Sequence, residues 1–545
     1  MVPRIALIDV LDPSNADDCE NIGQAGIAAL LRRQGCEVAL FSLDTPECAA
    51  ADAARIGRHD LFGFSIYPNT ADAVFVLAGR LKAAFGPAPI CAGGQLATAA
   101  AAELLRDCPS LDACVLGEGE GTMQAWAQAL ANGTGIHGLP GLRTREPATA
   151  TQRPVVGFGS ESGIWPARDL LAQSLRRGNP TARLSTTRGC VAACEFCAVN
   201  GFHGQAGGTR WRGRNVADVV GEIRWITDTF GVRSFVFNDA SFEDPGGAGR
   251  RRVASFCEAI EAEKHQWAFR CAMRAETVAV HGHALLPAMR HCGFTNVFIG
   301  IEAGNDEDLQ TFAKLASADQ NAAALEVAAA CDMDVTMGFI MFQPQSTPSS
   351  LRASFAALVR HGGDKASHFT RAVDVYFGTP LHRRLAREGM LTADFSYRNP
   401  LGYYFACREV AALAHSLEPV REHPEVGRLD GRMYHLGYTI SALRALYPEA
   451  AAGFVAGFAQ LRRDVADLLA YTFSPVFEGE MRPLTRAEQH TAIAGCAQMN
   501  VALARFGSRV LCARPFSGYF GTTANRLRRL PASNLSAASD RSSGR

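Results

Sequence analysis

The sequence has no excess of either charge and no long apolar run. Its 545 residues carry 54 lysines and arginines against 54 aspartates and glutamates. Such a balance offers no electrostatic footprint for a nucleic acid or an anionic membrane surface. The sequence contains no run of about 20 apolar residues without charge, so no membrane-spanning helix is expected. The first residues also lack the pattern of a secretory signal. These absences predict a cytoplasmic protein without nucleic-acid or membrane partners.

Cysteine is too scarce for a disulfide-stapled scaffold, with 16 residues in 545. In a reducing compartment, clustered cysteines bind metals or do redox chemistry, whereas scattered cysteines are small core residues. The chain is also too long for one ordinary domain. A chain of this length is expected to contain about three or four domains.

Short apolar runs alternate with helical segments over residues 1–140. Runs such as IALIDV (5–10) and DLFGFSI (60–66) lack polar alternation, which is typical of strands buried on both faces of a parallel sheet. This pattern predicts a doubly wound, Rossmann-like domain with its ligand at the carboxyl ends of the strands. No G-x-G-x-x-G follows the first strand, so the dinucleotide fingerprint is absent.

Three further regions follow. Residues 141–180 are rich in Gly, Pro, Arg and Ser and are expected to form a connector. Residues 181–389 contain six candidate strands, which predict a partial or full (β/α) TIM-like barrel. Residues 390–523 have helical periodicity, and the polar tail 524–545 is expected to be disordered. The six candidate strands are 182–189, 233–239, 267–276, 296–304, 334–342 and 369–379.

Cys190, Cys194 and Cys197 form a C-x3-C-x2-C cluster directly after the first barrel strand. A structural zinc site normally needs four ligands, often from two separated C-x2-C pairs, and no second pair lies nearby. Three thiolates can instead hold three irons of a [4Fe–4S] cluster and leave the fourth iron open. The spacing therefore favours an iron–sulfur cluster over zinc.

This cluster, with Phe196 before its last cysteine, resembles the signature of the radical S-adenosylmethionine (SAM) superfamily. Later segments resemble the family's SAM contacts in the expected order: FVFNDASF (235–242), GIEAG (300–304), GFIMFQPQST (338–347) and FGTPL (377–381). The resemblance implies that the open iron chelates SAM and that cleavage of SAM gives a 5′-deoxyadenosyl radical. The SAM-binding residues implied are Phe196, Asn238, Asp239, Arg274, Glu302 and Gly304.

Further polar residues are candidates for contacts with SAM or substrate, because a charge inside a barrel is costly unless it is paired or faces a ligand. Salt bridging between strands is the alternative for Arg270 and Glu276. Arg212 and Arg214 resemble the basic stretch that follows the cluster loop in this superfamily, and a solvated face is the alternative. Three residues after the barrel are candidates for a substrate pocket or for the core, namely Tyr403, Tyr404 and Cys407.

The N-terminal domain resembles the cobalamin-binding domain that precedes many radical SAM domains. The resemblance rests on ENIGQAGIAALLRRQG, GFSIYPNT, CAGGQLAT and LGEGEGT. The D-x-H-x-x-G motif that ligates cobalt from below is absent. A degenerate domain kept for packing is the alternative. The cobalamin-binding residues implied are Ser65, Thr70, Gly93, Gly94, Gly117, Glu118, Gly119 and Glu120.

Together these patterns predict a cobalamin-dependent radical SAM enzyme that methylates an unactivated carbon or phosphorus of a small molecule of secondary metabolism. The resemblance implies a [4Fe–4S] cluster, SAM and cobalamin as cofactors, methyl transfer from methylcobalamin, and an electron donor such as flavodoxin or ferredoxin. One alternative is a dehydration, oxidation, cyclisation or ring contraction, with or without cobalamin. A second is a cobalamin or iron–sulfur sensor, for which no DNA-binding helix pair is visible.

Overall fold

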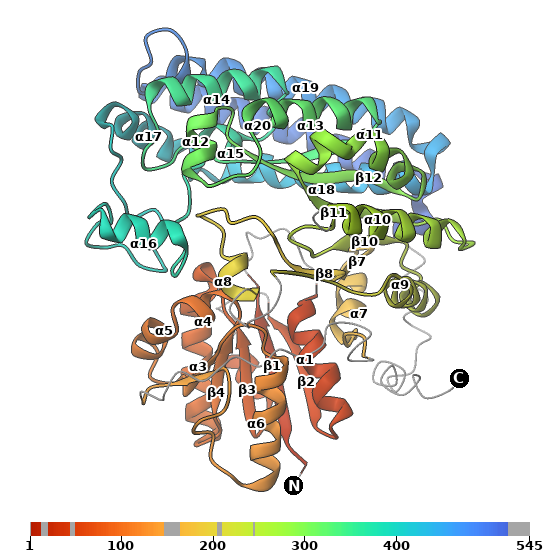
Figure 1. Ribbon diagram of the computed structural model, residues 1–545, viewed down its shortest axis with the longest axis vertical. Helices are drawn as coiled ribbons and strands as arrows, with labels where there is room; N and C mark the ends of the chain where they lie inside the picture. Colours follow the sequence, from red (N-terminus) through yellow and green to blue (C-terminus); the bar gives the residue numbers. More distant parts are fainter. Residues whose placement is uncertain are drawn as a thin grey trace.

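The computed structural model describes residues 2–11, 20–43, 49–146, 164–203, 210–243 and 246–520. Two α/β layers are stacked along its long axis, and long helices of the C-terminal third lie at the end opposite the N-terminus (Figure 1). The predicted disordered tail, 524–545, lies outside the described residues. Within those residues no helix is both long enough and apolar enough to cross a membrane.

The first layer is a six-stranded sheet in the order β2-β1-β3-β4-β5-β6, parallel except for β6. Its strands are β1 (Arg4–Val10), β2 (Glu37–Leu43), β3 (Leu61–Ser65), β4 (Ile90–Gly93), β5 (Ala113–Val115) and β6 (Leu142–Thr144). The strand order reverses between β1 and β3, and ligands of doubly wound sheets bind at such a switch point. The predicted doubly wound domain is confirmed.

Helices cover both faces of this sheet. They are α1 (Ile22–Arg33), α2 (Ala49–Ile56), α3 (Ala71–Phe85), α4 (Gln95–Ala99), α5 (Ala101–Asp107) and α6 (Glu120–Asn132). Helices α1 and α6 share one apolar core with Ile5 and Leu7, whereas Ala6 and Ile8 belong to the opposite core under α2 to α5. Alternate residues of β1 thus enter different cores, which is why the strand has no polar alternation.

The second layer is a five-stranded parallel sheet in the order β13-β12-β11-β10-β7. Its strands are β7 (Thr181–Leu184), β10 (Ser234–Phe237), β11 (Ala268–Arg274), β12 (Phe294–Glu302) and β13 (Asp334–Phe339). The barrel is therefore partial. The prediction of a sixth strand over 369–379 is wrong: the pairing shrinks to one bridge between Phe342 and Ala372. The chain then leaves the sheet, and the amide of Val375 donates to the carbonyl of Pro400.

The first predicted barrel strand, 182–189, is also interrupted. Strand β7 stops at Leu184, and β8 (Thr187–Gly189) turns away to pair antiparallel with β9 (Trp211–Gly213). The cysteine loop therefore starts from a separate two-stranded ribbon rather than from the sheet itself.

Helices cover the second sheet and continue into the C-terminal third. The segments between the strands are α9 (Val216–Phe230), α10 (Gly246–Glu261), α11 (Ala275–His291), α12 (Asp306–Thr311) and α13 (Ala318–Ala330). After the last strand come α14 (Pro348–Arg360), α15 (Ala366–Thr370), α16 (Pro380–Arg387), α17 (Arg408–Arg421), α18 (Pro424–Leu446), α19 (Pro448–Phe477) and α20 (Arg486–Leu511). Buried side chains of the sheet and of α17 to α20 form one continuous hydrophobic core.

Candidate functional site

The three predicted cluster ligands lie on one loop between β8 and α8 (Val199–His203). Cys190, Cys194 and Cys197 are all half-buried. Burial raises the pKa of each thiol, to about 12 for Cys194, and the nearby Lys314 ammonium opposes the shift at all three. Since a ligating thiol is deprotonated outright, a bound cationic centre would reverse this effect of burial.

The cysteine loop is fixed by the second layer. The amide of Glu195 donates to the carbonyl of Phe312 at 2.9 Å, and the carbonyl of Glu195 accepts from the amide of Leu381 at 3.0 Å. The ring of Phe196 meets Phe312 edge to face, with centroids 5.1 Å apart. The aromatic residue of the cysteine motif therefore packs beneath the loop.

Gly189, directly before Cys190, is required by the backbone path. Its φ is +84°, and a Cβ at this position would lie 1.9 Å from the carbonyl oxygen of Arg210. Residues with a side chain rarely adopt such a φ, and here the space is also filled by backbone. The start of the cysteine loop can be this tight because residue 189 has no side chain.

The arrangement of the thiols fits a [4Fe–4S] cluster. Cys190, Cys194 and Cys197 are free, partly exposed thiols on one loop. Three thiolates can each bind a different iron of a cubane and leave the fourth iron for another ligand.

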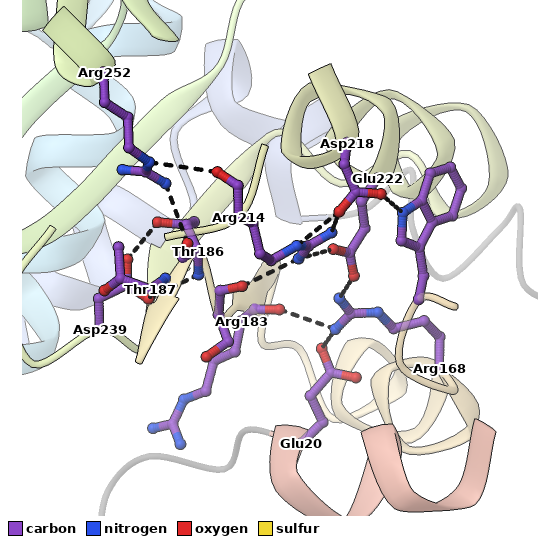
Figure 2. Close-up of polar contacts among 12 residues, drawn as sticks. Glu20, Arg168, Arg183, Thr186, Thr187, Arg214, Asp218, Glu222, Asp239 and Arg252 are labelled. Atoms are coloured by element: carbon purple, nitrogen blue, oxygen red, sulfur yellow. Dashed lines mark hydrogen bonds and ion pairs between the residues drawn. The ribbon is translucent and has the colours of Figure 1, made fainter. Parts of the chain in front are cut away.

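Asn238 and Asp239 follow β10 but have different surroundings. Asn238 is exposed. Asp239 is buried, and its Oδ1 accepts from the amides of Thr186 (2.8 Å) and Thr187 (2.9 Å), as Figure 2 shows. The structure therefore places Asp239 behind the turn that carries the cysteine loop. That both residues bind SAM stays a prediction.

Arg274, at the end of β11, lies within an acidic group. Its guanidinium donates to Glu276 Oε1 at 2.7 Å and lies 3.3 Å from Glu243 Oε1. Glu243 is 1 % exposed, and burial raises its pKa. Among the described residues, Glu243 Oε2 has no hydrogen-bond partner. Because both side chains interact electrostatically with Cys190, the orphaned oxygen is an acceptor beside the cluster position.

Glu302 and Gly304, in the GIEAG segment, have different roles. Glu302 has a φ of +66°, and the Ala303 amide donates to the carbonyl of Ile301 across it at 2.9 Å. A positive φ at a residue with a long side chain is a strained conformation of the kind found at functional sites. A Cβ on Gly304 would lie 2.6 Å from that of Ala357, so this glycine allows α14 to approach. That either residue binds SAM stays a prediction.

The residues predicted to bind cobalamin lie around the carboxyl ends of β3, β4 and β5. Ser65 ends β3 and is half-buried, and Gly93 and Gly94 follow at the end of β4. The buried Thr70 hydroxyl bonds to the backbone of Tyr67 and caps a short turn. The Gly117 amide donates to the Thr98 hydroxyl at 2.8 Å.

Gly119 and the two acidic residues face different neighbours. A Cβ on Gly119 would lie 3.1 Å from Ile27 Cδ1, which brings α1 close to this turn. Glu118 accepts from Arg188 at 2.8 Å and also binds Arg212 and His203. Glu120 binds Arg188 as well. These carboxylates join the first layer to the cysteine loop; that they also contact cobalamin stays a prediction.

The remaining candidates are placed by the core or by ion pairs. Arg212 and Arg214 are ion-paired rather than solvated. Arg270 lines a cavity of about 330 Å³ at the amino ends of the barrel strands, opposite the cysteine loop, and packs on Tyr438. Tyr403 is buried in an apolar cluster with Phe312, whereas Tyr404 is exposed and Cys407 precedes α17.

Sequence reasoning missed four residues of the site: Arg188, His203, Glu243 and Lys314. Arg188 immediately precedes Gly189-Cys190, and a charged residue next to a predicted metal loop was the available signal. Lys314 donates to the carbonyl of Gly300 at 2.9 Å and lies 4.0 Å from Glu302. No pattern in the sequence indicates that Lys314 returns to the cysteines, because it lies far from them along the chain.

Two family models match the two layers. The B12 binding domain model matches residues 11–127, and the Radical SAM superfamily model matches residues 184–358. The hopanoid C-3 methylase of Methylococcus capsulatus is 28% identical over 331 residues, which are 59% of this chain and 61% of that protein. The cytidylyl-2-hydroxyethylphosphonate methyltransferase of Streptomyces wedmorensis is 24% identical over 379 residues, 62% of this chain and 68% of that protein.

Solved structures resemble the whole fold. The radical enzyme OxsB with aqua-cobalamin and SAM matches with a TM-score of 0.68 and 15% identity over 98% of this chain and 84% of that one. The methyltransferase TsrM from Kitasatospora setae, with cobalamin and a [4Fe-4S] cluster, matches with a TM-score of 0.59 and 14% identity over 92% of this chain and 100% of that one. At such identities the likeness shows the fold.

The domain matches confirm the predicted cofactors. A B12-binding domain calls for cobalamin, and a radical SAM domain calls for SAM and a [4Fe–4S] cluster. The cysteine loop with three open thiols and the apposed strand ends of the first layer agree with this set. The chain therefore combines a B12-binding domain with a radical SAM domain that follows it, and it is an enzyme.

Proposed function

We propose that this protein is a cobalamin-dependent radical SAM methyltransferase that methylates an unactivated carbon, or a phosphorus, of a small molecule. One observation carries the proposal. The carboxyl edge of the B12-binding sheet faces the cysteine loop, and Glu118 at that edge binds Arg188, two residues before Cys190. A corrin held at this edge would be on the side of the sheet that faces the cluster ligands.

The described residues provide for each cofactor. Cys190, Cys194 and Cys197 would hold the cluster, and Glu243 Oε2, a buried acceptor without a partner among the described residues, suits the ammonium group of SAM. The strained Glu302 turn at the end of β12 and the exposed Asn238 after β10 lie on either side of β11 in the sheet and would complete the SAM site. Ser65 and Gly94 at the switch-point edge would approach cobalamin.

When bound, the reduced cluster supplies the electron that splits SAM into methionine and a 5′-deoxyadenosyl radical, and cobalamin supplies the methyl group. The chain's own part is to position and to enclose. Phe196, Phe312 and Tyr403 form an apolar base under the cysteine loop. Exclusion of water there protects a reactive radical from side reactions.

The proposed reaction uses two SAM molecules and two electrons for each product. For each methylated product, one SAM gives up its methyl group and becomes S-adenosylhomocysteine. A second SAM takes one electron, and its adenosyl part leaves as 5′-deoxyadenosine with a substrate hydrogen. A second electron restores the cobalt after methyl transfer. We infer that a flavodoxin or ferredoxin of the cytoplasm supplies both electrons, and that the partner molecule is a small molecule rather than a nucleic acid.

The experiment uses the full chain, purified without oxygen, reconstituted with iron and sulfide, and loaded with hydroxocobalamin. After reduction in the presence of methyl-labelled SAM, we expect S-adenosylhomocysteine to form in an amount matching the bound cobalamin, and 5′-deoxyadenosine to form as well. The Cys194→Ala variant should lose 5′-deoxyadenosine and the cluster absorbance yet retain cobalamin. Release of 5′-deoxyadenosine with no S-adenosylhomocysteine would contradict methyl transfer.

A non-methylating radical SAM reaction is the second candidate. The observation in its favour is that one curated relative, 28% identical over 194 residues, is the 4'-phospho-dehydrooxetanocin synthase of Priestia megaterium and not a methyltransferase by name. This candidate predicts 5′-deoxyadenosine alone, so the same assay separates the two functions.

A further inference from the structure

A buried guanidinium joins three segments that are distant in the sequence. Arg168 lies just before α7 (Asp169–Arg176), Glu20 just before α1, and Glu222 on α9. The Arg168 guanidinium donates to Glu222 Oε1 at 2.6 Å and to the carbonyl of Arg183 at 2.9 Å, and it also binds Glu20 (Figure 2). The B12-binding layer, the connector and the radical SAM layer therefore meet at one side chain.

The network continues on the radical SAM side through Arg214. This residue donates to Glu222 Oε2 at 2.6 Å and to Asp218, which also accepts from the indole of Trp165 at 3.0 Å. Burial is nearly complete: Arg168 is 1 % exposed, Glu20 3 %, Glu222 0 % and Arg214 5 %. Two guanidiniums and two carboxylates are thus almost fully buried at the junction between the layers, and the third carboxylate, Asp218, is partly exposed.

Net stability is a weak explanation for such a network. Buried ion pairs are often no more stabilising than apolar side chains of the same shape, because desolvation offsets the attraction. What a buried pair does impose is geometry, because a charge that loses its partner is left uncompensated in the interior. A network of five charges across three segments therefore holds one relative placement of those segments.

On the radical SAM side, the network reaches the cysteine loop. Arg214 donates to the carbonyl of Ser185 at 3.1 Å, and its own amide donates to the carbonyl of Thr186 at 2.9 Å. Asp239 holds the next two amides, and the Arg252 guanidinium binds the carbonyl of Thr186 at 3.1 Å (Figure 2). Four residues later the chain reaches Cys190.

On the side of the B12-binding layer, the network reaches the carboxyl edge of the first sheet, where the strand order reverses between β1 and β3. Glu20 directly precedes Asn21, whose side chain caps α1 by accepting from the Gln24 amide at 3.1 Å. The same amide side chain donates to Asp9 Oδ1 at 3.1 Å, at the carboxyl end of β1. A continuous series of contacts thus links this edge to the turn before the cluster ligands.

We propose that Arg168 is a positioning residue that fixes the cobalamin-binding edge relative to the iron–sulfur cluster. The inference rests on the proposed presence of both cofactors at these two places. The proposed role of Arg168 is to set the distance and relative orientation of the two cofactors. Residues that contact only one cofactor cannot set this distance. A misplacement of about 1 Å between reacting groups can lower a rate by roughly 100-fold.

The test compares Arg168→Met with Arg32→Met in the holoenzyme. Arg32 also joins α1 to the connector, through Asp169 at 2.8 Å, but lies outside the network, so it is a matched control. Pulsed EPR measures the dipolar coupling between cob(II)alamin and the reduced cluster, both of which are paramagnetic. We expect the distance distribution to broaden and shift in Arg168→Met and to stay unchanged in Arg32→Met.

The coupling ratio, which is the number of methyl groups transferred per 5′-deoxyadenosine formed, should fall by about 10- to 100-fold in Arg168→Met while both cofactors stay bound. If this variant does not fold, Glu20→Gln, which removes charge from the B12 side alone, is expected to broaden the distribution in the same way. An unchanged distribution in the variants that fold, with both signals present, overturns the inference. A wild type without cob(II)alamin signal instead overturns the proposed function, and this inference with it.

Discussion

Glu118 accepts a hydrogen bond from Arg188 at 2.8 Å and so connects the end of β5 to the residue two positions before Cys190. The Glu118 side chain is 5 % exposed and that of Arg188 is 17 % exposed. Arg188 also binds Glu120, so one guanidinium holds two consecutive acidic positions of the GEGE turn. The B12-binding layer therefore contacts the cluster loop directly, in addition to the network around Arg168.

Replacement of Arg188 by methionine should weaken the junction. The change leaves Glu118 and Glu120 with one cation fewer, and breaking a buried pair costs about 3 kcal/mol. The free energy of unfolding in urea measures this loss. Arg398→Met is the control: Arg398 bridges Asp72 and Asp107 at the surface with 37% of its side chain exposed, and such pairs contribute less than about 1 kcal/mol. Equal losses in the two variants would contradict the prediction.

The Glu118 carboxylate should also make stability depend on pH. Burial raises its pKa, but the hydrogen bond from His203 and the charges of Arg188 and Arg212 outweigh burial and lower the pKa to about 2 from an ordinary 4.5. A depressed pKa stabilises the fold above pH 4.5, and this contribution is lost as the pH falls toward 2. Urea titrations between pH 7 and pH 3 should show the advantage of wild type over Glu118→Gln shrinking below pH 4.5. A constant difference would refute the assignment.

Gly189→Ala should disrupt the cysteine loop. The added Cβ would meet the carbonyl of Arg210 at 1.9 Å, and Gly178 provides a control because its φ is +93° with nothing within 4 Å of its Cβ position. The left-handed backbone alone costs about 1–2 kcal/mol in either variant. We expect iron bound per chain after reconstitution to fall in Gly189→Ala and to persist in Gly178→Ala. Full iron content in both would show that the loop tolerates the change.

Asp239→Ala and Asn238→Ala separate a supporting role from SAM binding. Loss of the Asp239 carboxylate leaves the buried amides of Thr186 and Thr187 without acceptors, at a penalty of about 1–3 kcal/mol for each. We expect Asp239→Ala to bind less iron, and Asn238→Ala to keep its iron and bind SAM more weakly. Iron analysis and SAM binding by equilibrium dialysis report the two effects. Normal iron with weakened SAM binding in Asp239→Ala would instead make Asp239 a ligand contact.

The features that the sequence predicted are local in the chain. Cys190, Cys194 and Cys197 lie within eight residues, so their spacing alone identified a shared loop. Strands such as β1 were predictable because both of their faces are buried, which produces an uninterrupted apolar run. The spacing of the thiols and the pattern of apolar residues both depend only on residues that are close together in the chain.

The features that the sequence could not provide depend on contacts between distant segments. Asp239 follows a strand in the manner of a ligand residue, but its partners are two amides 53 and 52 positions away. The segment 369–379 has strand-like composition, yet its backbone follows an irregular path. The carbonyl of Arg371 accepts from the amides of Met341 and Phe342, whereas the amides of Val373 and Val375 donate to the carbonyls of Phe342 and Pro400. Arg168 lies in a stretch without periodicity, and nothing nearby indicates that it is among the most buried side chains.

The continuous core shared by the second sheet and the C-terminal helices limits how such an enzyme can change its substrate. Phe355 stacks on Phe477, and Phe369 on Phe473, so α19 supplies part of the interior on which α14 and α15 rest. A cut near residue 390 would expose this interior rather than release a separate module. New specificity in this architecture has to arise by point substitution or by exchange of the barrel together with its helices, because the two share one folding unit.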